Sequence, residues 1–329
     1  MTEAVGPTVV SLDTLSSEPH KPYGIITADR QGTKEFDDGI SVTPLPSAEE
    51  MYQVNVFAVD TSPLYFNYDV AQQVINRRET TLTYDNDGKL ISRTPMIDPE
   101  LTRGMHFSEK SGPLGALVVS FTVGINEPID NCSASYGQVE VAKNYPFNTF
   151  GGMCRDREHF IRYGRAAALI LMHLHNAGVS DMDIYNALLH VPRDRAADRG
   201  LNINRAFMIA ANHITGRIMR SEGRPAIYRT NRYADGTRPD PKLVLPAEFS
   251  TVPAPHVGMG LDVYTRVTSP LRRAEDFMMH GQLRLRHQRR QPGKRDYRLL
   301  TRTIRRLNNA KQHNAELITD ETEPVAQIA

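Results

Sequence analysis

Cysteine is scarce in this sequence, and long apolar runs are missing. Only Cys132 and Cys154 occur among 329 residues, too few for a disulfide framework or for a structural zinc site with its usual four ligands. Residues 1–22 contain no charged segment followed by an apolar one, and no run approaches the roughly 20 apolar residues that a membrane span needs. We therefore expect a cytoplasmic protein with reduced thiols and no membrane segment.

The overall composition is that of an ordinary globular protein. Hydrophobic residues make up 40% of the chain and charged residues 23%, with a net charge of +1, and these values are compatible with a sizeable buried core. The simplest organisation is one large domain at residues 23–285. A flexible tail at residues 1–22 precedes it, and a basic helical segment with a C-terminal tail follows at residues 286–329.

Positive charge gathers near the C-terminus. Residues 284–311 contain nine Arg and two Lys, whereas Asp296 is the only acid among them. Such a segment can attract a polyanion through phosphate contacts and counterion release. A solvated helix face has the same composition, so charge alone leaves both interpretations open.

Hydrophobic periodicity predicts a mixture of strands and helices without internal repeats, which is typical of an α+β (mixed α/β) domain. His173 and His175 fall on different sides of a predicted helix, and we do not interpret them as metal ligands. The pattern predicts strands at residues 23–29, 52–60, 116–123, 135–141 and 226–229, and helices at residues 66–80, 158–177, 204–220 and 270–286.

Four carboxylates crowd the segment that follows the first predicted strand, namely Asp29, Glu35, Asp37 and Asp38. Like charges held close together repel and raise one another's pKa unless a cation compensates them. Oxygen ligands in this number suit Mg²⁺ or Mn²⁺, and a pair of such ions can activate water for phosphodiester cleavage. The alternative is a solvent-exposed acidic turn.

This acidic segment belongs to a set of motifs that resembles a known family. Residues 27–40, TADRQGTKEFDDGI, resemble the signature TIDxxxAKDFDDAI of the RNB catalytic domain, which is found in ribonuclease II and ribonuclease R. Residues 250–280 resemble the longer family pattern HxGLxxYxxFTSPIRRYxDxxxH. Three shorter stretches, at residues 56–62, 94–101 and 206–212, match family motifs in the same order.

The resemblance implies a fold, a reaction and a set of site residues. The expected fold has a central β-sheet flanked by helices. The family removes nucleotides one at a time from the 3′ end of single-stranded RNA, and releases nucleoside 5′-monophosphates. Carried over by position, Asp29, Glu35, Asp37 and Asp38 bind Mg²⁺ (or Mn²⁺), while Asp37, Asp38 and Arg272 are catalytic, with Arg272 on the scissile phosphate.

Contacts to RNA are expected from a wider set of residues. Pro270 is predicted to begin a helix, so that backbone N–H groups and a guanidinium face a phosphate. Tyr84 is a candidate to replace the stacking tyrosine of the family, whose position falls on Thr83. The candidate RNA-binding residues are Tyr84, Arg229, Arg272, Arg273, Arg284 and Arg289.

Several family positions are altered. Glu35 replaces the usual Asp, the family's acidic pair before Phe207 becomes Arg205 and Ala206, and Ala274 replaces a tyrosine. The segment at residues 183–204 is shorter than in the family, which removes a region that carries another stacking aromatic. Neither the N-terminal tail nor the last 40 residues are long enough for the small β-barrel RNA-binding domains of typical members.

Three functions are compatible with this pattern. The first is an active, trimmed Mg²⁺-dependent exoribonuclease that acts on short or single-stranded RNA, or on a tRNA-like substrate. The second is a degenerate module that binds RNA or a protein partner without cutting. The third is a hydrolase of another tRNA-linked bond, such as an ester. The sequence indicates neither the physiological RNA nor the oligomeric state.

Overall fold

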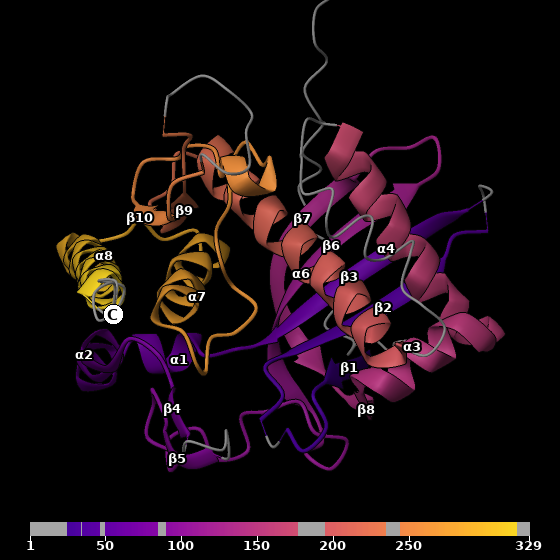
Figure 1. Cartoon of the computed structure of the whole chain (residues 1–329), viewed down its shortest axis with the longest axis horizontal. Helices are drawn as coiled ribbons and strands as arrows, with labels where there is room; N and C mark the ends of the chain where they lie inside the picture. Colours follow the sequence, from indigo (N-terminus) through magenta and orange to yellow (C-terminus); the bar gives the residue numbers. More distant parts are fainter. Residues whose placement is uncertain are drawn as a thin grey trace, which may run out of the picture.

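The protein was analysed as a computed structural model, which describes residues 25–33, 35–46, 50–84, 90–176, 195–234 and 244–320, without the side chains of residues 81–92, 175–176 and 311–320. A mixed six-stranded sheet carries helices on one face, and a second group of helices stands beside it (Figure 1). The expected α+β class is confirmed. No helix in the described ranges is long and apolar enough to cross a membrane.

Six strands form the central sheet in the order β7-β6-β3-β2-β1-β8. All neighbours pair antiparallel except β1 and β8, which run parallel. Apolar β-branched residues alternate along β3 and fill both faces of β6, as expected for strands near the centre of a covered sheet. The bounds are β1 Ile25–Asp29, β2 Asp38–Pro44, β3 Met51–Val59, β6 Leu114–Gly124, β7 Asp130–Val139 and β8 Val141–Pro146.

Three helices cover one face of this sheet: α3 (Phe147–Asp156), α4 (Glu158–Asn176) and α6 (Ala196–Ser221). Helices α3 and α6 approach closely because each has a glycine at the crossing. A Cβ atom on Gly151 would lie 2.0 Å from the Ala196 carbonyl oxygen, and one on Gly200 would lie 2.1 Å from the Phe147 carbonyl oxygen. Only glycine fits at these two positions, so this crossing fixes the start of α6.

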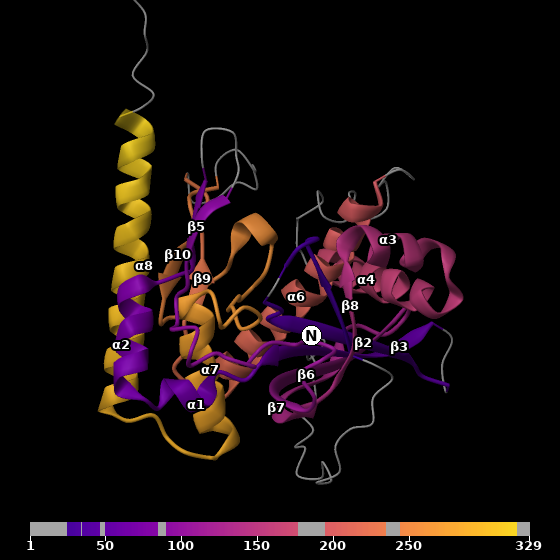
Figure 2. The ribbon, with the colours of Figure 1, turned by 90° about the horizontal axis from the view of Figure 1, so that it is seen from below.

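The second group of helices is built from two distant parts of the chain. Helices α2 and α8 lie side by side at the edge of the molecule, next to α1 and α7 (Figure 2). Two short sheets, β4–β5 and β10–β9, and the 3-10 helix η2 complete this part. The bounds are α1 Ser62–Tyr65, α2 Tyr68–Arg77, β4 Thr81–Tyr84, β5 Leu90–Thr94, β9 Tyr228–Thr230, β10 Glu248–Ser250, η2 Val257–Met259, α7 Ala274–His287 and α8 Lys294–Asp320.

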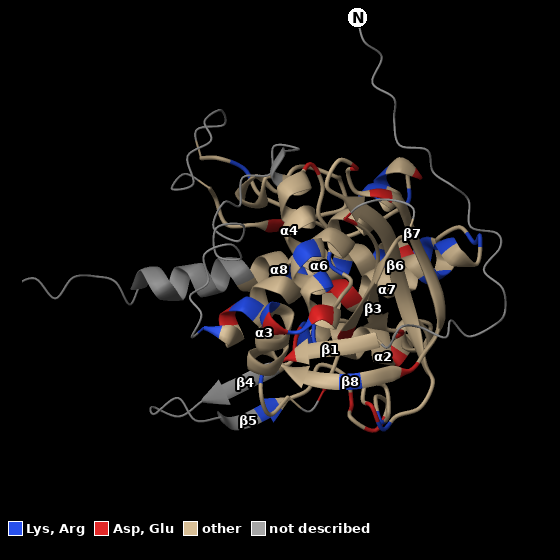
Figure 3. Ribbon diagram, turned by 90° about the vertical axis from the view of Figure 1, so that its right-hand side faces the viewer, with Lys and Arg blue, Asp and Glu red and all other residues tan. Residues whose placement is uncertain are grey.

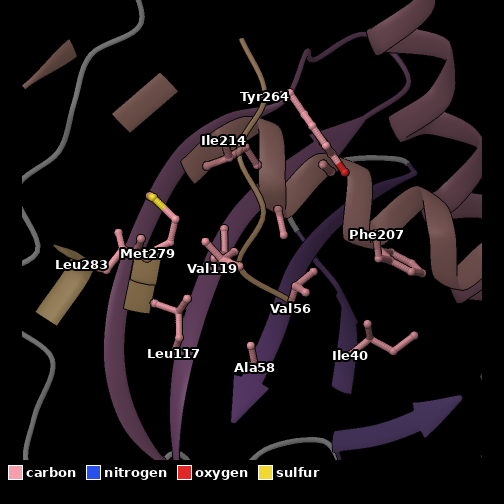
Figure 4. Close-up of a cluster of buried hydrophobic side chains, with 14 of the residues drawn as sticks. Ile40, Val56, Ala58, Leu117, Val119, Phe207, Ile214, Tyr264, Met279 and Leu283 are labelled. Atoms are coloured by element: carbon pink, nitrogen blue, oxygen red, sulfur yellow. The ribbon is translucent and has the colours of Figure 1, made fainter. Parts of the chain in front are cut away.

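One hydrophobic core joins the sheet to both groups of helices. Val56 and Val119 from the sheet, Phe207 from α6 and Met279 from α7 are all buried in it (Figure 4). Leu299 of α8 belongs to the same cluster. Because burial of each such side chain contributes roughly 1.5 to 3 kcal/mol, α7 is held firmly against the sheet. This contact brings the segment before α7 to the strand ends.

A buried polar network fastens α7 to the end of β3. Asp60 accepts hydrogen bonds from the Ser62 backbone N–H at 2.9 Å and from its hydroxyl at 2.6 Å. Arg284 forms an ion pair with Asp60 and donates to the Ser62 hydroxyl at 2.8 Å. Its guanidinium lies 3.7 Å above the ring of Tyr136. The network therefore supplies hydrogen-bond partners to both charged groups, Asp60 and Arg284, inside the fold.

Most predicted elements are confirmed, including the strand at residues 52–60 and the helices at residues 66–80 and 158–177. The helix expected at residues 204–220 is longer and begins at Ala196. Local periodicity predicted none of the short elements β2, α1, β4, β5, β8, α3, β10 and η2. These short or mixed segments acquire their structure from neighbouring strands and helices, which local periodicity does not report.

The predicted helix start at Pro270 is wrong, because α7 begins at Ala274. Backbone pairing with the end of α2 explains the difference. The Thr80 N–H donates to the Arg272 carbonyl at 3.1 Å, and the Ala274 N–H donates to the Arg78 carbonyl at 2.8 Å. Residues 270–272 thus form a turn, in which the Arg272 and Arg273 N–H groups donate to the Ser269 carbonyl, and Arg273 is extended with φ −136° and ψ 129°. Because no helix begins at Pro270, backbone N–H groups of a helix N-terminus are not available there to bind a phosphate.

Candidate active site

Three aspartates lie where β1 ends and β2 begins. Asp29 is the last residue of β1, Asp38 is the first residue of β2, and Asp37 precedes it. The antiparallel pairing of Ile26 with Ile40 fixes how the two strands face each other. Continued by three residues along each strand, this register sets Asp29 opposite Asp37. Acidic positions gather near β1, beside basic positions on α6 (Figure 3).

Burial makes these three carboxyls unusual. Asp37 is 5% exposed and Asp38 is 8% exposed. Burial raises the pKa of Asp37 to about 7, with Asp38 adding to the rise and Arg272 opposing it. Burial, then the charge of Asp29, raises the pKa of Asp38 to about 7. Burial also raises the pKa of Asp29 to about 7, with Asp37 contributing. The three groups therefore share one electrostatic environment.

One oxygen on each aspartate lacks a protein partner. Asp29 Oδ2, Asp37 Oδ1 and Asp38 Oδ1 are buried and make no hydrogen bond with any described residue. A side-chain hydrogen bond from Thr27 lowers the pKa of Asp29, and one from Asn204 lowers that of Asp38, but burial outweighs both. A buried oxygen without a partner is costly, so protons or a cation must compensate these three atoms.

Arg272 is brought to this cluster by the segment before α7. Its Nε atom donates to Asp37 Oδ2 at 2.7 Å, and its side chain remains 44% exposed. Its backbone carbonyl is fixed by the Thr80 N–H. Burial lowers the pKa of Arg272, but Asp37 and Asp38 outweigh it and the net shift is upward. The guanidinium is thus a permanent cation that contacts the acids on one side and solvent on the other.

Glu35 is engaged elsewhere. Its carboxylate forms an ion pair with Arg93 of β5, in which Arg93 Nη1 donates to Oε1 at 2.7 Å and Nη2 donates to Oε2. Glu35 still lies close enough to Asp37 to raise the pKa of that residue. Of the four carboxylates predicted to bind metal, Asp37 and Asp38 are buried and Asp29 is partly buried beside them, whereas Glu35 holds an arginine at their edge.

The aspartate oxygens are ligands of the type that a hard divalent cation prefers, but the carboxylates are not close enough together to coordinate one ion. No group of three or more His, Cys, Asp or Glu side chains in the described parts of the chain gathers as closely as a metal ion requires. Arg272 occupies Asp37 Oδ2 and Arg93 occupies Glu35. The three unpartnered aspartate oxygens are nevertheless the ligand type that Mg²⁺ and Mn²⁺ prefer. Coordination requires these carboxylates to lose their protons and close around the ion.

A second cluster of cations lies next to the aspartates. Arg266 Nη1 pairs with Glu275 Oε1 at 3.1 Å. Burial lowers the pKa of Arg229, and the neighbouring charges of Arg266 and Arg273 lower it further. Arg273 in turn lies close enough to Asp38 to lower the pKa of that carboxyl. Three guanidiniums thus lie around two buried carboxyls, Glu275 and Asp276, and the remaining positive charge suits a polyanion beside the acidic site.

The other predicted RNA-binding residues lie apart from this cluster or outside the described atoms. Arg284 stands eleven residues beyond Arg273 on α7, about 16 Å along the helix, and is paired with Asp60. Arg289 is exposed after the end of α7, with φ 54°. The backbone of Tyr84 ends β4, but its side chain is outside the described residues. RNA contacts by these residues stay a prediction.

Residues that sequence reasoning missed complete the site. Arg93 and Arg266 bring guanidiniums to its edge, and Asn204 on α6 hydrogen-bonds Asp38. No local signal identifies them, because each partner is distant in the chain or outside a motif. The altered family positions Ala206 and Ala274 are fully buried in the core, so neither offers a side chain to a ligand.

Comparison with known proteins identifies the relatives of this chain. The RNB domain family model matches residues 241–288. An uncharacterised ribonuclease of Synechocystis sp. is 23% identical over 293 residues, which cover 78% of this chain and 42% of that protein. The chain therefore spans about two fifths of the curated relative that it matches.

Solved structures of RNB proteins share the fold. RNase R of Mycoplasma genitalium in complex with ribose-methylated single-stranded RNA superposes with a TM-score of 0.72 and 13% identity, over 92% of this chain and 57% of that chain. Dss1 exoribonuclease of Candida glabrata gives a TM-score of 0.70 and 17% identity, over 91% and 45%. Yeast Ssd1, a pseudonuclease, gives 0.68 and 13%, over 87% and 42%.

Proposed function

Since this chain is a divergent RNB domain, we propose that it is a metal-dependent exoribonuclease that hydrolyses RNA phosphodiester bonds from the 3′ end and releases nucleoside 5′-monophosphates. The observation that carries the proposal is the meeting of the buried Asp37 and Asp38 and the partly buried Asp29 with Arg272. Four ionisable groups in one place, three of them with unpartnered oxygens, cost stability that bound protons or a bound cation would return.

The three aspartates are the residues that would hold Mg²⁺ or Mn²⁺. Asp29 Oδ2, Asp37 Oδ1 and Asp38 Oδ1 are free to act as ligands, and Asn204 and Thr27 hold the other side of two of these carboxyls. When bound, such an ion lowers the pKa of water and neutralises charge on the reacting phosphate. The aspartates, whose pKa values are raised to about 7, would give up any bound protons to hold the cation.

Arg272 has the position and chemistry to bind the phosphate that is cut. Its Nε atom is held by Asp37, which leaves the Nη atoms for a ligand, and its side chain is partly exposed. A guanidinium donates two parallel hydrogen bonds to phosphate oxygens, and its fixed charge stabilises the negative charge that grows on them in the transition state. Asp37 would therefore both hold the metal through Oδ1 and orient the arginine through Oδ2.

Substrate RNA would run from this point over the arginine cluster. The cluster of Arg229, Arg266 and Arg273 has one positive charge more than the carboxyls Glu275 and Asp276 beside it, and Arg273 lies close to Asp38. RNase R of Mycoplasma genitalium, which shares this fold, has been solved with single-stranded RNA and with double-stranded RNA. Contacts to the backbone phosphates position a strand without reading its sequence, so we propose single-stranded RNA of any sequence as the substrate.

A second candidate function is binding of RNA without cleavage. Two observations favour it: the acidic oxygens are partly occupied by Arg272 and Arg93, and yeast Ssd1, a pseudonuclease, shares the fold. Ala206 and Ala274, which replace an acid and a tyrosine of the family pattern, are buried and offer no side chain to RNA. Under this alternative the arginine cluster acts alone, and the aspartates keep their protons.

A direct assay separates the two. Purified protein is incubated with 5′-labelled single-stranded RNA in the presence of Mg²⁺, Mn²⁺ or a chelator, and the products are resolved on a gel. We expect stepwise shortening and mononucleotide release with either metal, and none with the chelator or with Asp38→Asn. Blocking the RNA 3′ end should protect it. Intact RNA under all metal conditions, with binding retained, favours the non-cleaving module.

A further inference from the structure

The pair formed by Glu35 and Arg93 joins two parts of the site. Both oxygens of the Glu35 carboxylate accept hydrogen bonds from the Arg93 guanidinium, and about a third of each side chain is exposed. Bidentate arginine–carboxylate contacts are among the strongest and most directional pairs in proteins. The Glu35 hydrogen bonds raise the pKa of Arg93, and the charges of Glu35 and Asp37 add to the rise.

Arg93 belongs to the hairpin of β4 and β5, whose base is attached to the Arg272 segment. Glu79 forms an isolated β-bridge with Arg273, and the Thr80 N–H donates to the Arg272 carbonyl at 3.1 Å. The Thr80 hydroxyl accepts from the Met96 N–H at 3.1 Å, which closes the hairpin base. The hairpin therefore holds Arg272 through its backbone and Glu35 through a side chain.

The longer side chain at position 35 has a consequence for metal binding. A divalent ion needs a carboxylate with a free lone pair directed at it, and Mg²⁺ tolerates little distortion. Both Glu35 oxygens already accept from a cation that would repel a nearby metal. The buried aspartates, in contrast, each keep one free oxygen. The aspartates therefore have an oxygen available for a metal ion, whereas the Glu35 carboxylate is used to bind Arg93.

We infer that Arg93 is a positioning residue that withholds Glu35 from direct metal coordination and ties the β4–β5 hairpin to the acidic end of the site. This inference rests on the proposed metal-dependent function and refines it. Asp29, Asp37 and Asp38 are the protein ligands, and Glu35 anchors the hairpin that fixes the backbone of Arg272. The Glu35–Arg93 pair contributes no net charge to the metal site.

Measuring metal affinity tests whether Glu35 is withheld from the metal, and it needs no assay of RNA cleavage. Mn²⁺ binding is measured by calorimetry on the full chain, in the parent, in Asp38→Asn and in the double variant Glu35→Gln/Arg93→Gln, which leaves the net charge unchanged. We expect the double variant to stay within about threefold of the parent and Asp38→Asn to lose about tenfold or more. A double variant as weak as Asp38→Asn overturns the inference and leaves the proposed function standing.

A charge exchange sharpens this test. In Glu35→Arg/Arg93→Glu the pair persists with reversed direction, and we expect Mn²⁺ affinity within about threefold of the parent because no ligand is lost. If Glu35 coordinates the ion directly, an arginine in its place should abolish binding. The far-ultraviolet circular dichroism of each variant identifies one that fails to fold, and the Gln/Gln variant then decides alone.

Hydrogen exchange tests whether Arg93 ties the β4–β5 hairpin to the acidic end of the site. We expect Arg93→Gln to raise the exchange rates of the β4–β5 amides and of the Arg272 segment several-fold, because the hairpin loses its anchor. The matched control is Arg103→Gln, which removes an exposed ion pair with Glu100 outside the site. If the amides of Arg93→Gln exchange as slowly as those of the parent, Arg93 does not anchor the hairpin. A parent that does not bind Mn²⁺ overturns the metal half together with the proposed function, while exchange still decides on the tie.

Discussion

Arg272 Nε lies 2.7 Å from Asp37 Oδ2, although 235 residues separate them in the chain. Asp37 is buried just before β2, and Arg272 lies in the turn before α7. The ion pair is therefore a product of the core that packs α7 against the sheet. It sets a permanent cation at the edge of three carboxyls whose pKa values burial has raised.

Replacing Arg272 should affect turnover far more than stability. Loss of a donor that stabilises transition-state charge costs about 100- to 1,000-fold in rate, so we expect Arg272→Ala to lower kcat by about that factor. Arg272→Lys should restore little, because lysine lacks the two parallel donors. Thermal melting should shift less than on breaking a fully buried ion pair, because the Arg272 side chain is 44% exposed and Asp37, whose pKa is raised to about 7, can take up a proton. An unchanged kcat, with activity established in the parent, removes Arg272 from the mechanism.

Asp38→Asn should separate binding from chemistry. The variant removes one metal ligand and leaves the arginine cluster of Arg229, Arg266 and Arg273 in place. We expect no Mg²⁺-dependent hydrolysis, but an RNA dissociation constant close to that of the parent by fluorescence anisotropy. The metal-free variant should melt no lower than the parent, because a buried charge that Asp29 repels is gone. Loss of RNA binding in this variant contradicts the assignment of binding to the arginines.

The pair of Asp60 and Arg284 should be structural. Removing one partner of a buried ion pair costs about 3 to 5 kcal/mol, and both side chains are largely buried. We expect Asp60→Asn and Arg284→Met to lower the free energy of unfolding by amounts near that range in urea titrations. Arg298→Met on the exposed side of α8 is the control and should change it little. An Arg284 variant of parental stability that binds RNA weakly restores the predicted RNA contact.

The basic helix α8 offers an independent test of RNA binding. Arg298, Arg302, Arg305 and Arg306 are exposed on it, whereas Arg295 contacts Asp296 and the Tyr65 carbonyl. If the exposed arginines contact phosphates, each loss should flatten the dependence of log affinity on log salt by about 0.7 for single-stranded RNA. We expect replacement of all four by Gln to reduce affinity and slope together. An unchanged slope identifies α8 as a solvated face.

His280 should make the fold sensitive to acid. Its ring is fully buried, and Nε2 contacts the Val267 carbonyl at 2.8 Å. Burial lowers its pKa to about 4, with the Val267 hydrogen bond opposing the shift. The unfolded chain therefore takes up this proton first, and stability falls as the pH drops from about 6.5 through about 4.

The measurement is the free energy of unfolding against pH. We expect the parent to lose on the order of 2 to 3 kcal/mol more than His280→Gln between these limits. His159→Gln on the exposed side of α4 should behave like the parent. Equal slopes in the parent and in His280→Gln contradict the neutral buried state.

The sequence by itself determined the elements with strong local patterns. The alternation from Tyr52 to Val59 requires a strand, and the apolar spacing that begins at Glu158 requires a helix. Motifs in the right order indicated the family, and the crowding of Asp29, Asp37 and Asp38 indicated a site. These features are short-range, because side-chain periodicity and charge spacing are written into neighbouring residues.

Only the tertiary structure decided how these residues are used. The start of α7 shifts from Pro270 to Ala274 because the backbone of Arg272 pairs with Thr80. Glu35 turns to Arg93, which is 58 residues away in the chain, and Arg284 turns inward to Asp60. Each outcome depends on which cation or backbone group packing brings within hydrogen-bonding distance. That depends on the whole core, and residue order along the chain does not report it.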